Sequence, residues 1–156
     1  MTSETSEVQV DYDRSVIGVE VELGSVEVTR EMVARYCDAV NETNPLYTDE
    51  AAAKAGPYGG LIAPTGLFSA LQFGGAGGPD PKVKFGTTSF HAGSKLESFE
   101  PLRVGDTITA RTQVKEVYPK TGRTGTMVFV VRRTDYVNQH GRVVAAIEQS
   151  QVHREV

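Results

Sequence analysis

The sequence has little sulfur and few histidines, which limits the chemistry open to it. Cys37 is the single cysteine among 156 residues, so an internal disulfide and a thiolate metal cluster are both excluded. A lone cysteine in a helical pattern is interpreted as a small buried hydrophobe rather than a nucleophile. His91, His140 and His153 are the only histidines, and no pair of them has a spacing typical of a metal site. We expect neither a metal nor a cofactor.

An excess of positive charge and a long apolar run are also absent. The formal net charge is -4 and the 16 Lys and Arg residues are scattered, which argues against a surface for nucleic acid. The first residues, MTSETSEVQVDYD, are polar and acidic where a secretory signal would be basic and then apolar. No later stretch is suited to span a bilayer. The expectation is a cytoplasmic protein that binds neither nucleic acid nor membrane.

The length and composition predict one compact domain over residues 1–156. With 39% hydrophobic and 23% charged residues, the chain has the balance of a single globular core. We expect the ordered core to span about residues 17–152 and residues 1–13 to form a polar tail.

The first half of the chain carries helical signals after an opening strand or hairpin in SVIGVEVELGSVEV. Thr29 is a plausible N-cap for a helix over residues 30–40, which Asn41 would end and Pro45 cannot continue. DEAAAKA (49–55) predicts a short helix. TGLFSALQF (65–73) has no charged residue and predicts a helix buried in the core. GGAGGPDPK (74–82) reads as a loop.

Beyond that loop the pattern is that of consecutive strands. In DTITARTQVKEVY, five residues are predicted to share one face of a strand, while Arg111, Gln113 and Lys115 share the other. The five are Ile108, Ala110, Thr112, Val114 and Tyr118. PKTGRTG and NQHG supply turns between antiparallel neighbours. The predicted class is α+β, an antiparallel sheet wrapped around a central apolar helix, and its exposed edges favour dimerisation.

Three segments in order carry a family resemblance: NETNPLYTDEAAA, GPYGGLIAPTGLF and FHAGSKLESFEPLRVGDTITA. Together they resemble the MaoC-like hydratases and dehydratases, and within them the N-terminal MaoC half, the FAS1-like dehydratase domain. The chain is also similar to the small subunits of heterodimeric hydroxyacyl dehydratases. The likeness covers residues 17 to 152 and implies the hot-dog fold and an acyl-thioester substrate.

The resemblance places two family positions at altered residues. Active hydratases of the family carry Asp-x-Asn-Pro-Leu/Ile-His, whose Asp and His are taken to activate the added water. Here the Asp position is Glu42 and the His position is Tyr47, while Asn44 and Pro45 match. A phenol near pKa ~10 is mostly a donor at pH 7, and an extra methylene displaces the carboxylate. The acid/base pair is therefore predicted to be degenerate.

The binding geometry is predicted to survive. Asn44 and the stretch Gly59, Gly60, Ile62, Ala63 and Pro64 are the expected substrate-binding residues, because the glycines permit close backbone approach and a helix N-terminus suits a thioester oxygen. Pro64 stands where the family's hydratases commonly have a His, a further departure.

Several alternatives stay open at this point. Glu42 is read equally well as a solvated acid, and Tyr47 better as a packing or substrate-lining residue than as a catalyst. His91 is a modest candidate for a partner-facing or substrate-side role, whereas His140 reads as a turn residue and His153 as part of the terminal tail.

The leading hypothesis is a subunit that lines the acyl pocket of an enoyl-CoA or enoyl-ACP hydratase, or 3-hydroxyacyl dehydratase, while a MaoC-like partner subunit supplies the Asp and His. The rivals are a self-sufficient homodimeric hydratase that uses Glu42, and a non-enzymatic module that binds an acyl thioester. The sequence leaves open the acyl group, its carrier and the reaction direction.

Overall fold

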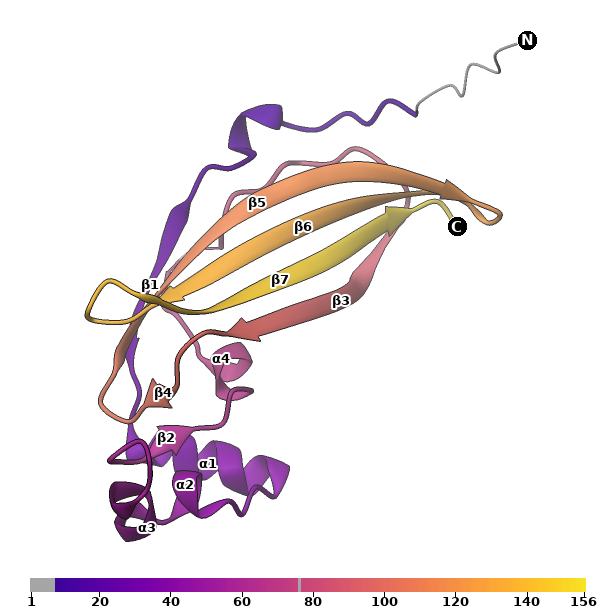
Figure 1. The fold of residues 1–156 in the computed structure, drawn as a ribbon. Helices are drawn as coiled ribbons and strands as arrows, with labels where there is room; N and C mark the ends of the chain where they lie inside the picture. The colour runs from indigo at the N-terminus through magenta and orange to yellow at the C-terminus, as the bar shows by residue number, and fades with distance from the viewer. Residues whose placement is uncertain (1–7, 76) are drawn as a thin grey trace.

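The computed structural model describes residues 8–75 and 77–156 and arranges them as a curved sheet with four α-helices gathered at one end and a 3-10 turn near the N-terminus (Figure 1). The helices are η1 (Arg14–Val16, a 3-10 turn), α1 (Arg30–Val40), α2 (Pro45–Thr48), α3 (Glu50–Ala55) and α4 (Leu67–Ala70). The strands are β1 (Val21–Glu27), β2 (Ile62–Ala63), β3 (Thr88–Ser98), β4 (Leu102–Arg103), β5 (Thr107–Gly122), β6 (Gly125–Val137) and β7 (Val143–Arg154).

Five strands form one antiparallel sheet in the order β1-β5-β6-β7-β3, and β2 pairs with β4 in a small second sheet. The two predicted turns lie where expected, between Gly122 and Gly125 and between Asn138 and Arg142. In the second turn, Asn138 Oδ1 accepts from the backbone N–H groups of His140 and Arg142 at 3.0 and 3.1 Å. With α4 packed against this sheet, the predicted α+β hot-dog class is confirmed.

Helix α1 confirms the predicted helix over residues 30–40. The Thr29 hydroxyl accepts from Met32 N at 3.2 Å, and Asn41 ends the helix in the left-handed region with φ 56°. One face of α1 is buried through Val33 and Cys37, which is what its apolar spacing predicts. The short helix predicted over residues 49–55 is confirmed as α3.

Helix α4 is shorter than predicted. A helix over about residues 65–73 was expected, but the backbone becomes extended at Leu71, with φ -65° and ψ 132°. The following residues are held by tertiary contacts instead: Gly75 N donates to the carbonyl of Leu23 on β1 at 2.7 Å, and the Phe73 ring lies 6.0 Å from that of Tyr136. Long-range pairing with the sheet therefore outweighs local helix propensity here.

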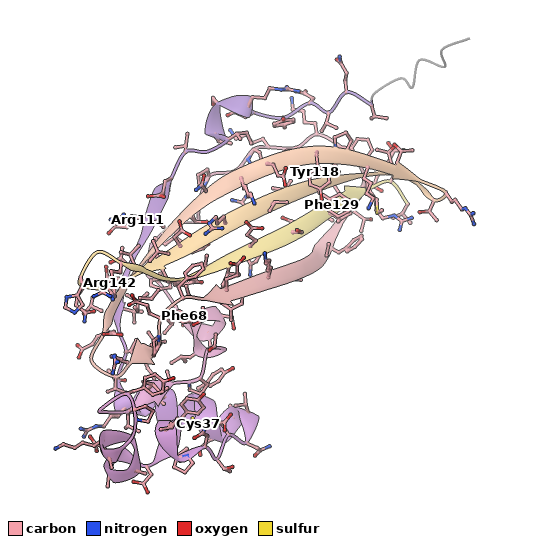
Figure 2. All side chains as sticks on the ribbon, in the orientation of Figure 1. Cys37, Phe68, Arg111, Tyr118, Phe129 and Arg142 are labelled. Carbon is pink, nitrogen blue, oxygen red and sulfur yellow. The ribbon has the colours of Figure 1, made fainter. Side chains whose placement is uncertain are left out.

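Only half of α4 is buried, contrary to the expectation of a helix without a solvent face. Leu67 and Phe68 are almost fully buried, whereas Ser69 and Ala70 are exposed in the chain as described. Phe68 packs on Tyr136 of β6 with ring centroids 5.3 Å apart, beneath the sheet in Figure 2. We define the inner face of the sheet as the face that carries Tyr136.

A β-bulge corrects one predicted face. The β5–β6 register shifts between Val114 and Glu116, so the residues beyond the bulge exchange faces. Tyr118 consequently lies on the outer face, where it stacks on Phe129 with ring centroids 5.1 Å apart (Figure 2). The prediction that Tyr118 shares a face of the strand with Ile108 is therefore wrong. The other four predicted inner residues are buried.

The N-terminal stretch contacts the sheet and the loop before β3. Within the predicted tail, Val10 is 6% exposed, and Asp13 N donates to the Pro81 carbonyl at 2.6 Å. The 3-10 turn η1 then precedes β1, so a short turn rather than a strand is the first element described. Residues 1–7 of the expected tail lie outside the described residues.

Candidate functional site

The turn after α1 places Glu42 in a backbone role. Its N–H donates to the Cys37 carbonyl at 2.9 Å, and its Oε1 accepts from the N–H groups of Thr43 and Asn44 at 3.1 and 3.0 Å. A carboxylate oxygen that accepts two backbone N–H groups stabilises the turn. The Glu42 carboxylate is therefore oriented toward the backbone of Thr43 and Asn44. Glu42 is thus engaged locally at the position where the family carries an Asp.

Asn44 is likewise engaged with the backbone. It caps α2, because its Oδ1 accepts from Leu46 N at 3.0 Å, and Pro45 occupies the first helical position. Its carbonyl accepts from the Thr48 hydroxyl at 3.1 Å. The Asn-Pro pair therefore builds a helix start, as its conformational preferences predict.

Tyr47 borders two hollows and packs against the core. One hollow of about 330 Å³ is walled by Cys37, Asp38 and Leu61 among others, and a second of about 280 Å³ by Ile62, Ala63 and Thr65 among others. Glu42 is in neither lining. The structure thus brings Tyr47 together with two of the predicted substrate-binding residues, Ile62 and Ala63, whereas Glu42 lines neither hollow.

Cys37 lies in the wall of the larger of these hollows with little exposure. Burial raises the pKa of its thiol, and the nearby carboxylates of Glu42 and Asp38 raise it further. A thiol with a raised pKa stays protonated at neutral pH and is a poor nucleophile. At 3% exposure, Cys37 fits the interpretation as a small buried hydrophobe.

Two sequence motifs meet beside Tyr47 through the small β2–β4 sheet. Ile62 pairs with Arg103 and Ala63 with Leu102. The Arg103 guanidinium donates to the Tyr58 carbonyl and lies 5.9 Å from the Tyr58 ring. Arg103 thereby holds the start of the glycine turn, a link that the sequence alone did not indicate.

The glycine turn itself leaves open space. Gly59 has φ 68°, and a Cβ built at Gly59 or Gly60 would meet no atom within 4 Å. Backbone groups at both positions can therefore be approached closely by another molecule. Pro64 is buried, and its carbonyl accepts from Leu67 N at 3.0 Å, so it begins the turn into α4.

Sequence reasoning missed two polar residues that share a hollow with Tyr47. Ser98 and Glu100 line the 280 Å³ hollow with Thr65. The Glu100 carboxylate accepts from the Arg142 guanidinium at 2.9 Å. Ser98 and Glu100 lie just before the PLRVGD motif, within the segment FHAGSKLESFEPLRVGDTITA that carries the family resemblance. Their place in that segment was the signal that could have identified them.

The Asp of PLRVGD has a structural role. Asp106 is 7% exposed, and its carboxylate accepts from Arg103 N and from the Gln139 amide, each at 2.9 Å. It therefore ties the turn after β4 to the turn between β6 and β7. These hydrogen bonds account for the Asp in the PLRVGD motif without a catalytic role.

The histidines are placed on three different elements. His91 lies on β3, where its Nε2 is 3.1 Å from the Ser94 hydroxyl, and His140 is exposed in the predicted turn. His153 belongs to β7 and lines a cavity, so its assignment to a terminal tail is wrong.

Within residues 8–75 and 77–156, no three His, Cys, Asp or Glu side chains are arranged to hold a metal ion. The described residues also include no helix of the length and hydropathy that a bilayer crossing requires.

Comparison with known proteins identifies relatives over most of the chain. A UPF0336 protein of Thermobifida fusca is 34% identical over 94 residues, which are 58% of this chain and 62% of that protein. A probable enoyl-CoA hydratase alpha subunit of Thermomonospora curvata is 30% identical over 138 residues, 78% of this chain and 43% of that one. The chain thus spans less than two thirds of the length of either relative.

The fold has a counterpart in a solved complex. The structure of the C-terminally truncated HadBC (3R-hydroxyacyl-ACP dehydratase) complex of Mycobacterium tuberculosis superposes with a TM-score of 0.64 at 20% identity, covering 88% of this chain and 96% of that one. At this identity the likeness supports the fold. The model of the FAS1-like, dehydratase domain region matches residues 15–147. The chain therefore belongs to the FAS1-like dehydratase domain family, the N-terminal type of MaoC-like domain.

Proposed function

We propose that the chain is a subunit of an acyl-thioester hydratase or dehydratase, which lines the acyl pocket while a related MaoC-like partner supplies the Asp and His. The observation that carries this proposal is the engagement of the Glu42 carboxylate by its own turn. The Glu42 carboxylate oxygen accepts two backbone N–H groups of its own turn, and Glu42 is absent from both hollows that Tyr47 borders.

The chemistry of hydration explains why the engagement of Glu42 matters. Hydration of a 2-enoyl thioester adds the oxygen of water to C3 and a proton to C2, so a base must take a proton from water and an acid must deliver one. The thioester oxygen also needs donors as enolate-like charge develops. A single phenol in the hollow is one group, whereas the reaction needs both a base and an acid.

The residues around Tyr47 suit binding better than catalysis. Ile62 and Ala63 give an apolar wall, and the open backbone at Gly59 and Gly60 offers close approach to a thioester. Two printed names agree with the proposal: one relative is a probable enoyl-CoA hydratase alpha subunit, and one structure of similar fold is the HadBC (3R-hydroxyacyl-ACP dehydratase) complex. The proposed ligand is an acyl-CoA or acyl-ACP thioester.

The test is an assay of the hydration of a short and a long 2-enoyl-CoA, in which the loss of the enoyl absorbance measures the rate. The purified chain is assayed alone and then with a MaoC-like chain that carries an intact Asp-x-Asn-Pro-x-His motif. We expect activity only in the mixture and an unchanged rate with Glu42→Gln. Tyr47→Ala should raise the KM for the long substrate more than for the short one, because it alters the wall of the pocket.

Other outcomes separate the rival functions. Activity of the chain alone that Glu42→Gln abolishes would make it a self-sufficient homodimeric hydratase. Saturable binding of an acyl-CoA, without activity in either setting, would indicate a binding module.

A further inference from the structure

The end of the sheet that is farthest from the helices carries a row of apolar side chains on its outer face (Figures 1 and 2). Tyr118 of β5 is paired with Phe129 of β6, and Phe129 is paired with Val152 of β7. Val152 is paired in turn with Phe90 of β3. Directly paired residues of neighbouring strands point to the same face of a sheet. These four side chains therefore form one continuous row, which we call the tip row.

The tip row is open to solvent. Tyr118 is 36% exposed, Phe90 is 42% exposed and Phe129 is half-buried, while Val152 between the rings is 2% exposed. The Tyr118 and Phe129 rings stack with an angle of 5° between their planes, so they present a flat surface. A single exposed apolar residue is ordinary, whereas a contiguous apolar patch with aromatic rings is typical of an interaction surface.

Positive side chains border the tip row on the side of the β5–β6 hairpin. The next outer-face positions are Lys120, Met127 and Arg154, which are paired across β5, β6 and β7. Arg123 is exposed in the two-residue turn between Gly122 and Gly125. Within residues 8–75 and 77–156, none of these three cations forms an ion pair. Their charges are available to a partner.

The charge differs on the other side of the tip row. There, Glu116 of β5 is exposed on the outer face, paired with Val131. The next charged outer-face groups neutralise one another, because Lys115 and Arg133 both form ion pairs with Glu148. The whole chain has a formal net charge of -4, so the positive hairpin side is a local feature. An acidic partner fits this border by charge complementarity.

The dimensions of the tip row match a short helix. Four neighbouring strands are separated by three spacings of about 4.8 Å, so the row is roughly 14 Å long. An α-helix that rises about 1.5 Å per residue covers this length with about ten residues. Helices are a common layer on an apolar sheet face. We propose that an acidic amphipathic helix of a partner protein docks here, with its apolar stripe on the tip row and its carboxylates beside Lys120, Arg123 and Arg154.

A second copy of the chain is a poor occupant for this surface. Among the described helices only α1 has ten residues or more, and its apolar side chains Val33 and Cys37 are already buried in the chain's own core. The site is also independent of the proposed function. A subunit that pairs with the edge of β3 would lie in the plane of the sheet and leave the outer face uncovered.

The test is fluorescence anisotropy of a labelled, stapled helical peptide of about 14 residues, titrated with the full purified chain. Its leucines recur at helical spacing on one face and its other positions are glutamate, and the staple offsets the marginal stability of a short helix. We expect saturable binding that weakens as NaCl is raised. The same peptide with lysine in place of glutamate should bind at least about tenfold more weakly.

Variants of the chain locate the binding surface. The double variant Lys120→Glu/Arg123→Glu should weaken binding by about tenfold or more, because it reverses two charges. Tyr118→Ala should weaken it by about fivefold or more through the loss of an aromatic anchor. Arg111→Glu reverses a charge on the same outer face near the helices (Figure 2), and Phe99→Ala removes an aromatic ring that is 52% exposed elsewhere. Both of these controls should leave the affinity unchanged.

Three results would overturn the proposal: no saturable binding, equal affinity for the lysine peptide, or equal affinity in the wild type and the double variant. Tighter binding to vesicles of equal phosphatidylglycerol and phosphatidylcholine than to the peptide would assign the wrong partner class. Self-association in sedimentation that Tyr118→Ala abolishes would make a second copy the occupant. If Tyr118→Ala lacks a cooperative thermal transition, the double variant of exposed residues decides. The enoyl-CoA hydration assay is independent of these outcomes, so the two proposals fail separately.

Discussion

Replacing Phe68 tests whether α4 anchors the sheet despite its single turn. The Phe68 side chain is 1% exposed, and its ring lies 5.3 Å from that of Tyr136. Truncation of a fully buried Phe to Ala removes its transfer free energy and leaves a cavity, which together cost about 3–5 kcal/mol. The aromatic pair contributes about 0.5–1.5 kcal/mol of that loss. Phe68→Leu should therefore cost only about 1–2 kcal/mol, because most of the volume is kept.

The assay is urea unfolding followed by far-UV circular dichroism at fixed protein concentration. Phe99→Ala is the matched control, because Phe99 is 52% exposed and its loss should cost below about 1 kcal/mol. If Phe68→Ala costs no more than Phe99→Ala, α4 does not pack on the sheet as described and the reasoning fails. A changed slope against urea would instead indicate an altered unfolded or native ensemble.

Three further predictions concern the sheet and its turns. Gly78→Ala should destabilise the fold by about 1–3 kcal/mol through overpacking, because a Cβ there would be 2.5 Å from Thr112 Cγ2. Thr112→Ser in the same chain should recover part of that loss in thermal unfolding because it removes the contacting methyl. Asp106→Ala should cost about 2–3 kcal/mol in urea unfolding, since two donors lose their partner, whereas Asp106→Asn should cost less. The hydrogen bond from Lys115 lowers the pKa of the Glu148 carboxyl below its ordinary 4.5, so its stabilisation is present above about pH 4.5 and is lost as the pH falls through the folded-state pKa. Glu148→Gln should therefore lose less stability than the wild type between neutral and acidic pH, and an identical acid dependence would contradict this.

Local signals in the sequence determined much of the helical half. Thr29 and Asn41 have the side chains and backbone tolerance that begin and end a helix, so the bounds of α1 followed from residues next to one another. The turns near Gly125 and Asn138 were set in the same way. The family was evident from short motifs in a fixed order, which the match over residues 15–147 confirmed.

The candidate site could be predicted only in part. The motif pointed to Glu42 and Tyr47, but no spacing in sequence could reveal that the Glu42 oxygen is held by its own turn. Likewise, Ser98 and Glu100 line the same hollow as Tyr47 although they are distant from it in the sequence.

Tertiary structure decided the features that depend on distant partners. Helix α4 ends early because the chain after it pairs with β1 and packs on Tyr136, against its own helical propensity. One bulge near Val114 moved Tyr118 to the outer face, since the alternation of a strand reverses wherever a residue is inserted. The cavity beneath residues 77–83 is lined by four strands, β1, β5, β6 and β7, and by a loop. Sequence determines local conformation because its causes lie within a few residues, whereas faces, helix lengths and cavities are set by contacts that only the folded chain makes.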